Sequence, residues 1–308
     1  MRNAFASEIT SLAKDDDRIV LLSGDIGNRL FDEYKKYFKD RFYNCGVAEA
    51  NMTGVASGMA ICGLIPITYT ITPFNTYRCY EQIRVDICYN NVCVIIVGVG
   101  SGLSYASLGA THQSCEDIAI MRTLPNMTVI CPGDPVEVKL ALKASINNPG
   151  PVYIRLGKKG EPVIHDCMPD FKIGKGIIIN QGNDACIINT GNTLPVAVEA
   201  ANILKENGNN VQVVSMHTVK PLDNELLEEI FDKFPVIATI EEHNLQGGLG
   251  SAIAEWRSDY GKLKNILCRF GTPDYFLSMT GGHNNARKIS GLDPKNIARI
   301  IKKNINGL

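Results

Sequence analysis

Several features that would place this chain in a special class are absent from its sequence. Its formal net charge is -1 and it has no tail rich in lysine and arginine, so the basic excess typical of a nucleic-acid binder is missing. Its longest apolar segments, such as residues 92–99, are far too short to cross a membrane. In the first ten residues, MRNAFASEIT, no charged start is followed by the apolar stretch of a secretory signal. These absences favour a cytoplasmic protein whose partners are small molecules or other proteins.

Sequence motifs for zinc and for nucleotides are also absent. No two of the ten cysteines have C-x-x-C spacing, and several, such as Cys93 and Cys131, lie in apolar runs where cysteine packs as a small hydrophobe. No G-x-G-x-x-G follows a predicted strand, and the glycines of LQGGLGSA lack the Lys and Ser/Thr of a phosphate-binding loop. We therefore expect a reduced enzyme without a metal site of its own.

Helical and strand patterns alternate along the 308 residues. Short apolar runs predict strands at 19–23, 65–69, 92–99, 128–131, 152–155, 186–189, 211–215, 236–241 and 266–270. Amphipathic or small-residue runs predict helices at 4–14, 48–62, 77–88, 114–122, 136–147, 194–207, 224–234 and 248–260. This alternation is typical of βαβ units around a parallel sheet. The segment 157–175 interrupts it with charges, prolines and glycines, so we predict two parallel-sheet α/β domains, at 1–165 and 176–308.

Two groups of residues near predicted strand ends could bind a ligand. Glu49, in NCGVAEANMTG, begins an otherwise apolar helix. It could simply complement the helix dipole, or it could share a proton with a bound partner. The aromatic residues Phe74, Tyr77 and Tyr80 follow at helical spacing, which fits a hydrophobic core as well as a platform for a cofactor.

Two further residues could contact a substrate. His112, in GATHQSCEDIA, lies in a glycine-containing loop just before a predicted helix, where histidine can act as an acid, a base or a structural residue. Arg155 ends a predicted strand in GPVYIRLGKKG. It could be a surface cation, but open parallel sheets bind ligands outside the carboxyl ends of their strands, where arginine suits an anion.

Taken together and in order, these motifs resemble the transketolase family over nearly the whole chain. GVAEANMTGVASGMA resembles the segment with the family's cofactor-activating glutamate, and TITPFNTYRCYEQIR resembles its aromatic stacking segment. THQSCEDIAIMRTLPNMTVICPGD and GPVYIRL are similar to the family's substrate-loop and phosphate-site segments. The resemblance implies a pyrimidine-binding domain followed by the family's C-terminal domain.

The resemblance implies thiamine diphosphate as the cofactor. Glu49 matches the glutamate that hydrogen-bonds the pyrimidine ring nitrogen, and Phe74 matches the aromatic residue that stacks on that ring. Ile71 and Tyr77 complete the expected pocket. Asp25 follows the first strand and is either a neighbour of the cofactor or a turn residue. The organic chemistry would belong to the cofactor, while the protein supplies placement and electrostatics.

The resemblance also implies roles for substrate-binding residues. His112 matches the histidine that hydrogen-bonds the sugar near its reacting carbonyl, and Arg155 matches an arginine that holds the substrate's phosphate. The family's GEDGPTH loop reads SYASLGATH here, so Leu108 stands where an aspartate is expected, and Gly100 replaces an expected histidine. Because a lost polar contact changes discrimination strongly, we expect an unusual sugar or anionic donor, with Arg29 as a replacement cation.

The family's diphosphate site is missing from this chain. That site uses a G-D-G motif and a later Asn to hold Mg²⁺, and Gly24-Asp25-Ile26-Gly27 does not match it. Split members of the family carry the two halves as separate chains. The resemblance therefore implies a separate N-terminal subunit that holds the diphosphate and Mg²⁺, and an α₂β₂ heterotetramer in which two copies of this chain pair.

Two rival interpretations stay open at the level of sequence. A β subunit of a 2-oxo acid dehydrogenase, or a relative of 1-deoxyxylulose 5-phosphate synthase, would share the domain order and the glutamate. A non-catalytic scaffold or regulatory subunit would keep the fold without the chemistry. The joint presence of Glu49, Phe74, His112 and Arg155 favours an active transketolase subunit, because a scaffold requires none of them.

Overall fold

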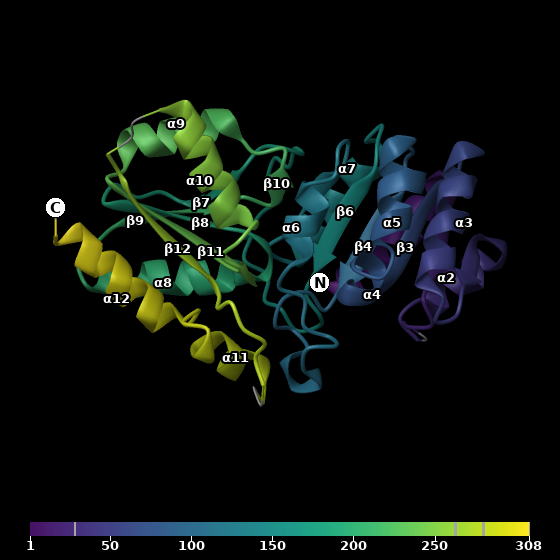
Figure 1. The fold of residues 1–308 in the computed structure, drawn as a ribbon, viewed down its shortest axis with the longest axis horizontal. Coiled ribbons are helices and arrows are strands. Elements are labelled where there is room, and N and C mark those ends of the chain that lie inside the picture. Colours follow the sequence, from purple (N-terminus) through teal and green to yellow (C-terminus); the bar gives the residue numbers. More distant parts are fainter. Residues whose placement is uncertain (28, 262–263, 279–280, 308) are drawn as a thin grey trace.

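The computed structural model describes residues 1–27, 29–261, 264–278 and 281–307, and it contains two sheets that lie side by side (Figure 1). The first sheet has seven strands in the order β10-β5-β6-β4-β3-β1-β2. Its strands are β1 (Ile19–Ser23), β2 (Phe42–Asn44), β3 (Ile65–Ile71), β4 (Ile95–Val99), β5 (Thr128–Ile130), β6 (Val152–Leu156) and β10 (Thr218–Lys220). All neighbours are parallel except β10, which runs antiparallel to β5.

Helices cover both faces of the first sheet because its central strands are apolar on both sides. Alternate residues of one strand enter different cores: Ile19 and Leu21 pack with Phe5 of α1, whereas Val20 and Leu22 pack with Met52 of α3. The helices of this half are α1 (Arg2–Asp15), α2 (Asp32–Tyr37), η1 (Lys39–Arg41), α3 (Glu49–Ile61), α4 (Thr72–Thr76), α5 (Tyr80–Gln82), η2 (Ile83–Tyr89), η3 (Ala106–Leu108), α6 (Asp117–Arg122) and α7 (Pro135–Ile146).

The second sheet has five strands in the order β12-β11-β8-β9-β7, parallel except for β7 against β9. Its strands are β7 (Ile177–Asn180), β8 (Ala185–Asn189), β9 (Val211–Ser215), β11 (Val236–Asn244) and β12 (Ile266–Thr272). Its helices are η4 (Gly191–Thr193), α8 (Leu194–Glu206), α9 (Asn224–Lys233), α10 (Leu249–Tyr260), α11 (His283–Ile289) and α12 (Pro294–Ile305). The two parallel-sheet α/β units that the alternation predicted are therefore present.

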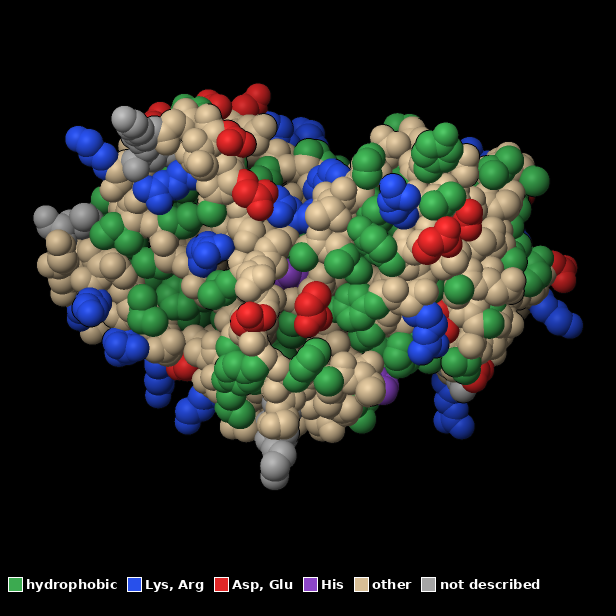
Figure 2. Space-filling view, in the orientation of Figure 1, with side chains coloured by type: hydrophobic (Ala, Val, Ile, Leu, Met, Phe, Trp, Pro, Cys, Tyr) green, Lys and Arg blue, Asp and Glu red, His purple; other side chains and the backbone are tan. Residues whose placement is uncertain are grey.

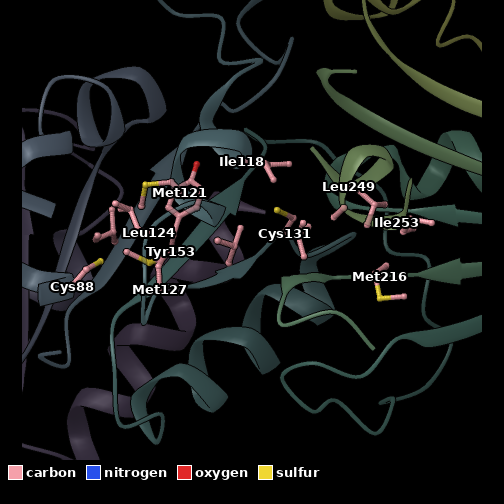
Figure 3. Packing of buried hydrophobic residues seen from close by; sticks show 14 of the residues in the cluster. Cys88, Ile118, Met121, Leu124, Met127, Cys131, Tyr153, Met216, Leu249 and Ile253 are labelled. Atoms are coloured by element: carbon pink, nitrogen blue, oxygen red, sulfur yellow. The ribbon is translucent and has the colours of Figure 1, made fainter. Parts of the chain in front are cut away.

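The two units share a strand and a hydrophobic core. Strand β10 comes from the second predicted range, yet it extends the first sheet through its pairing with β5. One buried cluster joins Met121 and Cys131 of the first unit to Met216 and Leu249 of the second (Figure 3). The buried residues of the two units thus pack across the predicted domain boundary. This shared core fixes the two sheets relative to each other.

Several elements differ from those predicted. The helix expected at 77–88 begins at Thr72 instead, because Pro73 suits a first helical turn, and it continues as α5 and the π-helix η2. The short elements α2, β2, β7 and β10 were not predicted, nor were α11 and α12. Helix α12 carried readable signals, because Asp293 accepts a hydrogen bond from the Asn296 N–H and Pro294 follows it.

Two global features agree with the composition. All ten cysteines are free thiols in the structure. Among the helices of the described chain, none combines the length and hydrophobicity that would let it cross a bilayer.

The shared core predicts that the two units unfold together. The single tryptophan, Trp256, lies in α10 and reports on the second unit, whereas far-ultraviolet circular dichroism reports on both. We expect the two signals to give the same denaturation midpoint. Met216→Ala should lower the free energy of unfolding by about 2–5 kcal/mol, because it opens a cavity in the fully buried shared core. Met168→Ala, whose side chain is exposed, is the control, and separate transitions for the two signals would contradict the prediction.

Candidate functional site

Three of the residues singled out in the sequence gather at the carboxyl edge of the first sheet. Glu49 follows β2, Phe74 follows β3, and His112 lies in the connection after β4. These strands belong to one parallel sheet, so the segments that leave their carboxyl ends meet at the same edge. The rings of Phe74 and His112 lie edge to face, with centroids 5.5 Å apart.

Glu49 is buried at the start of α3 and pairs with a residue that the sequence analysis did not select. The Arg78 Nη1 donates to Glu49 Oε2 at 2.7 Å, and the Arg78 guanidinium lies 4.9 Å from the centre of the Phe74 ring. The Glu49 side chain is 1% exposed, whereas that of Arg78 is 48% exposed. A flat hydrogen-bond donor therefore already occupies the space between the carboxylate and the aromatic ring.

Gly24 packs closely against the residues beside Glu49. A Cβ on Gly24 would come within 3.0 Å of Thr70 and 3.3 Å of the Glu49 side chain, so a larger residue would crowd both. The buried Thr70 Oγ1 has no hydrogen-bond partner. A carboxylate, an aromatic face, a small cradle and an unsatisfied hydroxyl together suit a planar ring that carries nitrogen donors, such as an aminopyrimidine.

His112 is half-buried and held by its neighbour. Its Nδ1 lies 2.8 Å from Thr111 Oγ1, and its backbone N–H donates to Gly109 O at 3.0 Å. These contacts hold the imidazole beside Phe74.

A hollow of about 590 Å³ lies next to this cluster, between the two domains. Tyr77 and Glu116 line it from the first domain, and Asp274 and Phe276 line it from the second. The Tyr77 hydroxyl donates to Glu116 Oε2 at 2.7 Å. Figure 2 shows acidic and hydrophobic side chains side by side where the domains meet on this face. Tyr77 therefore borders the inter-domain hollow as well as the end of α4.

The structure corrects the expectation for Arg155. Its side chain is 2% exposed, and its Nε donates to Asp117 Oδ2 at 2.7 Å. Its Nη2 donates to Asp117 Oδ1, to Ser114 O and to Glu242 O. Burial alone would raise the pKa of Asp117, but the Arg155 charge holds that pKa below its ordinary value. Arg155 is thus committed to a buried ion pair, which disfavours it as a ligand for a substrate phosphate.

The other residues expected in the site lie at several different places on the first domain. Arg29 is exposed and lines a separate hollow of about 380 Å³ beside α1, across the sheet from α3, so the structure does not bring it to Glu49. Asp25 is exposed and exchanges hydrogen bonds with the Asn44 side chain, as a turn residue would. Leu108 is 53% exposed in η3, and Ile71 ends β3 just before Phe74.

Gly100 has a structural explanation. Its φ is +76°, and a Cβ there would overlap the Tyr105 ring. The position expected to carry a histidine is thus required to be glycine by the path of this loop.

Arg78 and Glu242 are the functional candidates that the sequence analysis missed. Arg78 lies four residues after Phe74 in TYRCY, a spacing that puts two side chains on one side of a helical segment, so a signal existed. Glu242 meets the His112 connection only through the packing of the second domain, which no local pattern reveals. No group of three or more His, Cys, Asp and Glu side chains placed to hold a metal ion occurs within the described ranges.

Models of two protein families match the chain. The transketolase pyrimidine binding domain matches residues 1–161, and the transketolase C-terminal domain matches residues 174–297.

Relatives match over nearly the whole chain. A putative transketolase C-terminal section from Methanocaldococcus jannaschii is 38% identical over 98% of this chain and 95% of its own length. One of the apulose-4-phosphate transketolase subunits from Actinobacillus succinogenes is 34% identical, covering 95% and 94%. A 1-deoxy-D-xylulose-5-phosphate synthase from Shouchella clausii is 35% identical over 97% of this chain, which spans only 48% of that enzyme. A solved split gene transketolase, described as an inactive beta4 tetramer, has a TM-score of 0.91 at 34% identity and covers 99% and 98%.

The structural role of Arg155 can be tested by substitution. Arg155→Met leaves the Asp117 carboxylate buried without its cation, so the free energy of unfolding should fall by about 3–5 kcal/mol in urea denaturation. The control is Arg18→Met, which breaks the exposed pair with Asp16 and should leave stability nearly unchanged. Full stability of Arg155→Met together with a raised KM for a sugar phosphate would restore the phosphate-binding interpretation.

Proposed function

Since the chain belongs to the transketolase family, we propose that it is the pyrimidine-binding subunit of a two-chain, thiamine-diphosphate-dependent transketolase that moves a two-carbon ketol unit. The observation that carries this proposal is the convergence of Glu49, Phe74 and His112 at one edge of the first sheet. A scaffold subunit would have no need for a buried carboxylate beside an aromatic face.

The residues beside Glu49 fit the pyrimidine half of the cofactor. Glu49 would hold a proton at the pyrimidine ring nitrogen, Phe74 would stack on the ring, and Ile71 would close the pocket behind it. Thr70 Oγ1, which is buried without a partner, is available to a ring substituent. When bound, thiamine diphosphate supplies the nucleophilic carbon that breaks and forms the carbon–carbon bond of a ketose.

His112 is the residue we propose for the substrate. Its imidazole lies beside Phe74, so a donor that approaches the cofactor passes this ring. There it would hydrogen-bond an oxygen of the sugar near the reacting carbonyl, and it would give or take a proton at that oxygen.

The substrate we propose is an unusual sugar phosphate or another anionic sugar. Leu108 is exposed where the family's loop carries an aspartate, so a polar contact to a donor hydroxyl is replaced by an apolar surface. The relative from Actinobacillus succinogenes is named for apulose 4-phosphate, which fits a branch of the family with varied sugars. With Arg155 buried and Arg29 distant, we assign the substrate's anionic end to neither of them.

The partner we propose is a separate N-terminal chain that holds the diphosphate and its Mg²⁺. This chain lacks the G-D-G motif, and the relative from Actinobacillus succinogenes is itself named as one of a transketolase's subunits. We expect an α₂β₂ heterotetramer in which copies of this chain pair, and the free thiols favour assembly in the reducing cytoplasm. The domain division that we propose remains 1–165 and 176–308, although strand β10 of the second range pairs with β5 of the first sheet.

The rival within the same cofactor class is separated by an assay. A 1-deoxyxylulose 5-phosphate synthase or a 2-oxo acid dehydrogenase decarboxylates pyruvate or a branched 2-oxo acid, whereas a transketolase transfers a ketol unit from a ketose. The match to one half of a 1-deoxy-D-xylulose-5-phosphate synthase makes this control necessary.

The proposal predicts a split cofactor site. Calorimetry with thiamine diphosphate and Mg²⁺ should show no binding to this chain alone and saturable binding to its mixture with the N-terminal subunit. In that mixture, Glu49→Ala should abolish or weaken binding and lower ketol transfer by about 10²–10⁴-fold, because proton transfer at the ring is lost. Glu33→Gln, on the exposed face of α2, is the matched control. Tight binding to the isolated chain would contradict the split site.

Arg78 predicts a second effect on the cofactor. Its guanidinium holds the Glu49 carboxylate and the Phe74 face, which are the two contacts proposed for the pyrimidine. Arg78→Ala removes a competitor, so the Kd of thiamine diphosphate in the mixed complex should fall about 2- to 5-fold, because the cofactor no longer has to displace a cation that is itself half-exposed. Arg84→Ala, an exposed arginine of η2, should leave the Kd unchanged. Weaker binding by Arg78→Ala would instead make Arg78 a support of the pocket.

A further inference from the structure

A connection of residues 100–114 joins β4 to the segment before α6, and we call it the His112 loop. Its two ends are tied together, because Gly102 N–H donates to Ser114 O at 2.9 Å and Ser114 N–H donates to Gly102 O at 3.0 Å. His112 lies two residues before this tie. The position of the whole closed loop therefore decides where the imidazole meets the pocket.

One buried carboxylate of the second domain accepts a hydrogen bond from this loop. Glu242, near the end of β11, is 1% exposed, and its Oε2 accepts the Leu103 N–H at 2.9 Å. Its Oε1 accepts from His283 Nε2 at 2.7 Å and from Arg287 Nε, both in α11. One carboxylate thus joins a backbone donor of the loop to an imidazole and a guanidinium of the second domain.

The contacts around this carboxylate leave little freedom. A Cβ on Gly102, whose φ is +62°, would come within 2.6 Å of Glu242 Oε2. Asn192 Nδ2 bridges Glu242 Oε2 at 3.3 Å and Ser104 Oγ at 3.2 Å. The Gln113 side chain donates to Leu277 O at 3.4 Å. The second domain therefore hydrogen-bonds the loop at two successive residues, Leu103 and Ser104, and again at Gln113 beside His112.

Hydrophobic packing and the charge of Glu242 also hold the His112 loop against the second domain. Leu103 and Ala106 of the loop form a buried apolar cluster with Leu277 and Ala286, and α11 lies beside the loop at the lower edge of the view in Figure 1. Burial alone would raise the pKa of Glu242, but Arg287 and His283 hold that pKa well below its ordinary value. The carboxylate therefore stays charged, which strengthens its hydrogen bond to the Leu103 N–H.

We propose that Glu242 is a positioning residue for ketol transfer, because it holds the loop that presents His112 to the substrate. This assigns the second domain an indirect part in the reaction, through His112, and it rests on the function proposed above. The residues proposed for the pyrimidine lie on α3, on α4 and at the end of β3 instead, so Glu242 should act on the transfer step and leave cofactor binding alone.

Glu242→Gln tests the proposal in the complex with the N-terminal subunit. An amide has one acceptor oxygen, so it satisfies either the two α11 side chains or the Leu103 N–H, and it loses the charge. We expect kcat to fall about 10²-fold, as for a misplaced catalytic group, with an unchanged Kd for thiamine diphosphate. Glu241→Gln is the matched control, because that neighbouring buried carboxylate accepts from the Leu249 and Gly250 N–H groups of α10.

The decisive measurement is a double-mutant cycle with His112→Ala. If Glu242 acts through His112, Glu242→Gln lowers kcat in the wild-type background and has almost no further effect in the His112→Ala background. Equal losses in both backgrounds, or an unchanged kcat, would overturn the proposal. A wild-type complex that binds the cofactor but transfers no ketol unit would instead refute the proposed function.

Hydrogen exchange provides a readout that does not depend on turnover. Amides of residues 100–114 should exchange faster in Glu242→Gln than in Glu241→Gln, and equal protection would count against the proposal. If Glu242→Gln fails to assemble, Asn192→Ala takes its place, because it removes the contacts to Ser104 and Glu242 without stranding a charge. The same dependence on His112 is then expected with a smaller loss in kcat, of about 10-fold.

Discussion

The buried ion pair between Arg155 and Asp117 is the interaction on which the seam between the domains depends. Taking two charges out of water is costly, and the cost is offset only when their hydrogen bonds are satisfied. Arg155 meets this condition by bonding both Asp117 oxygens and the carbonyls of Ser114 and Glu242. The Arg155 guanidinium thereby connects β6 to α6, to the tied end of the His112 loop and to β11. The loop and the second domain are therefore both bonded to the same side chain.

The sequence pattern predicts the sheets and the grouping of the proposed site for the same physical reason. Apolar runs separated by helices make parallel strands, and the carboxyl ends of such strands share an edge, which brings Glu49, Phe74 and His112 together. Strand pairings and ion pairs between residues far apart in the chain produce no comparable sequence pattern. The three-residue strand β10 crosses to another sheet, and Arg155 finds its partner Asp117 through packing. A motif match could therefore name Arg155 as a site residue but could not show that it is buried.

The geometry at Glu49 is that of half a binding site. A half-exposed arginine spans a buried carboxylate and an aromatic face, which are the two contacts proposed for the cofactor. A buried carboxylate without a partner is costly, so a ligand that displaces Arg78 must replace its hydrogen bond to Glu49. The arrangement therefore keeps the carboxylate paired until the proposed cofactor binds.

Different residues of the His112 loop fix its path and form its exposed surface. Gly100 and Gly102 have positive φ and press against Tyr105 and Glu242, so side chains at these positions would move the loop itself. Leu108 lies 53% exposed on the far part of the loop, where a substitution would change the surface offered to the proposed sugar at little cost in stability. An enzyme built this way can accept a new donor by changing the exposed tip of the loop. The part of the loop near residues 102–104, which the second domain holds, would keep His112 in the position that the proposed reaction needs.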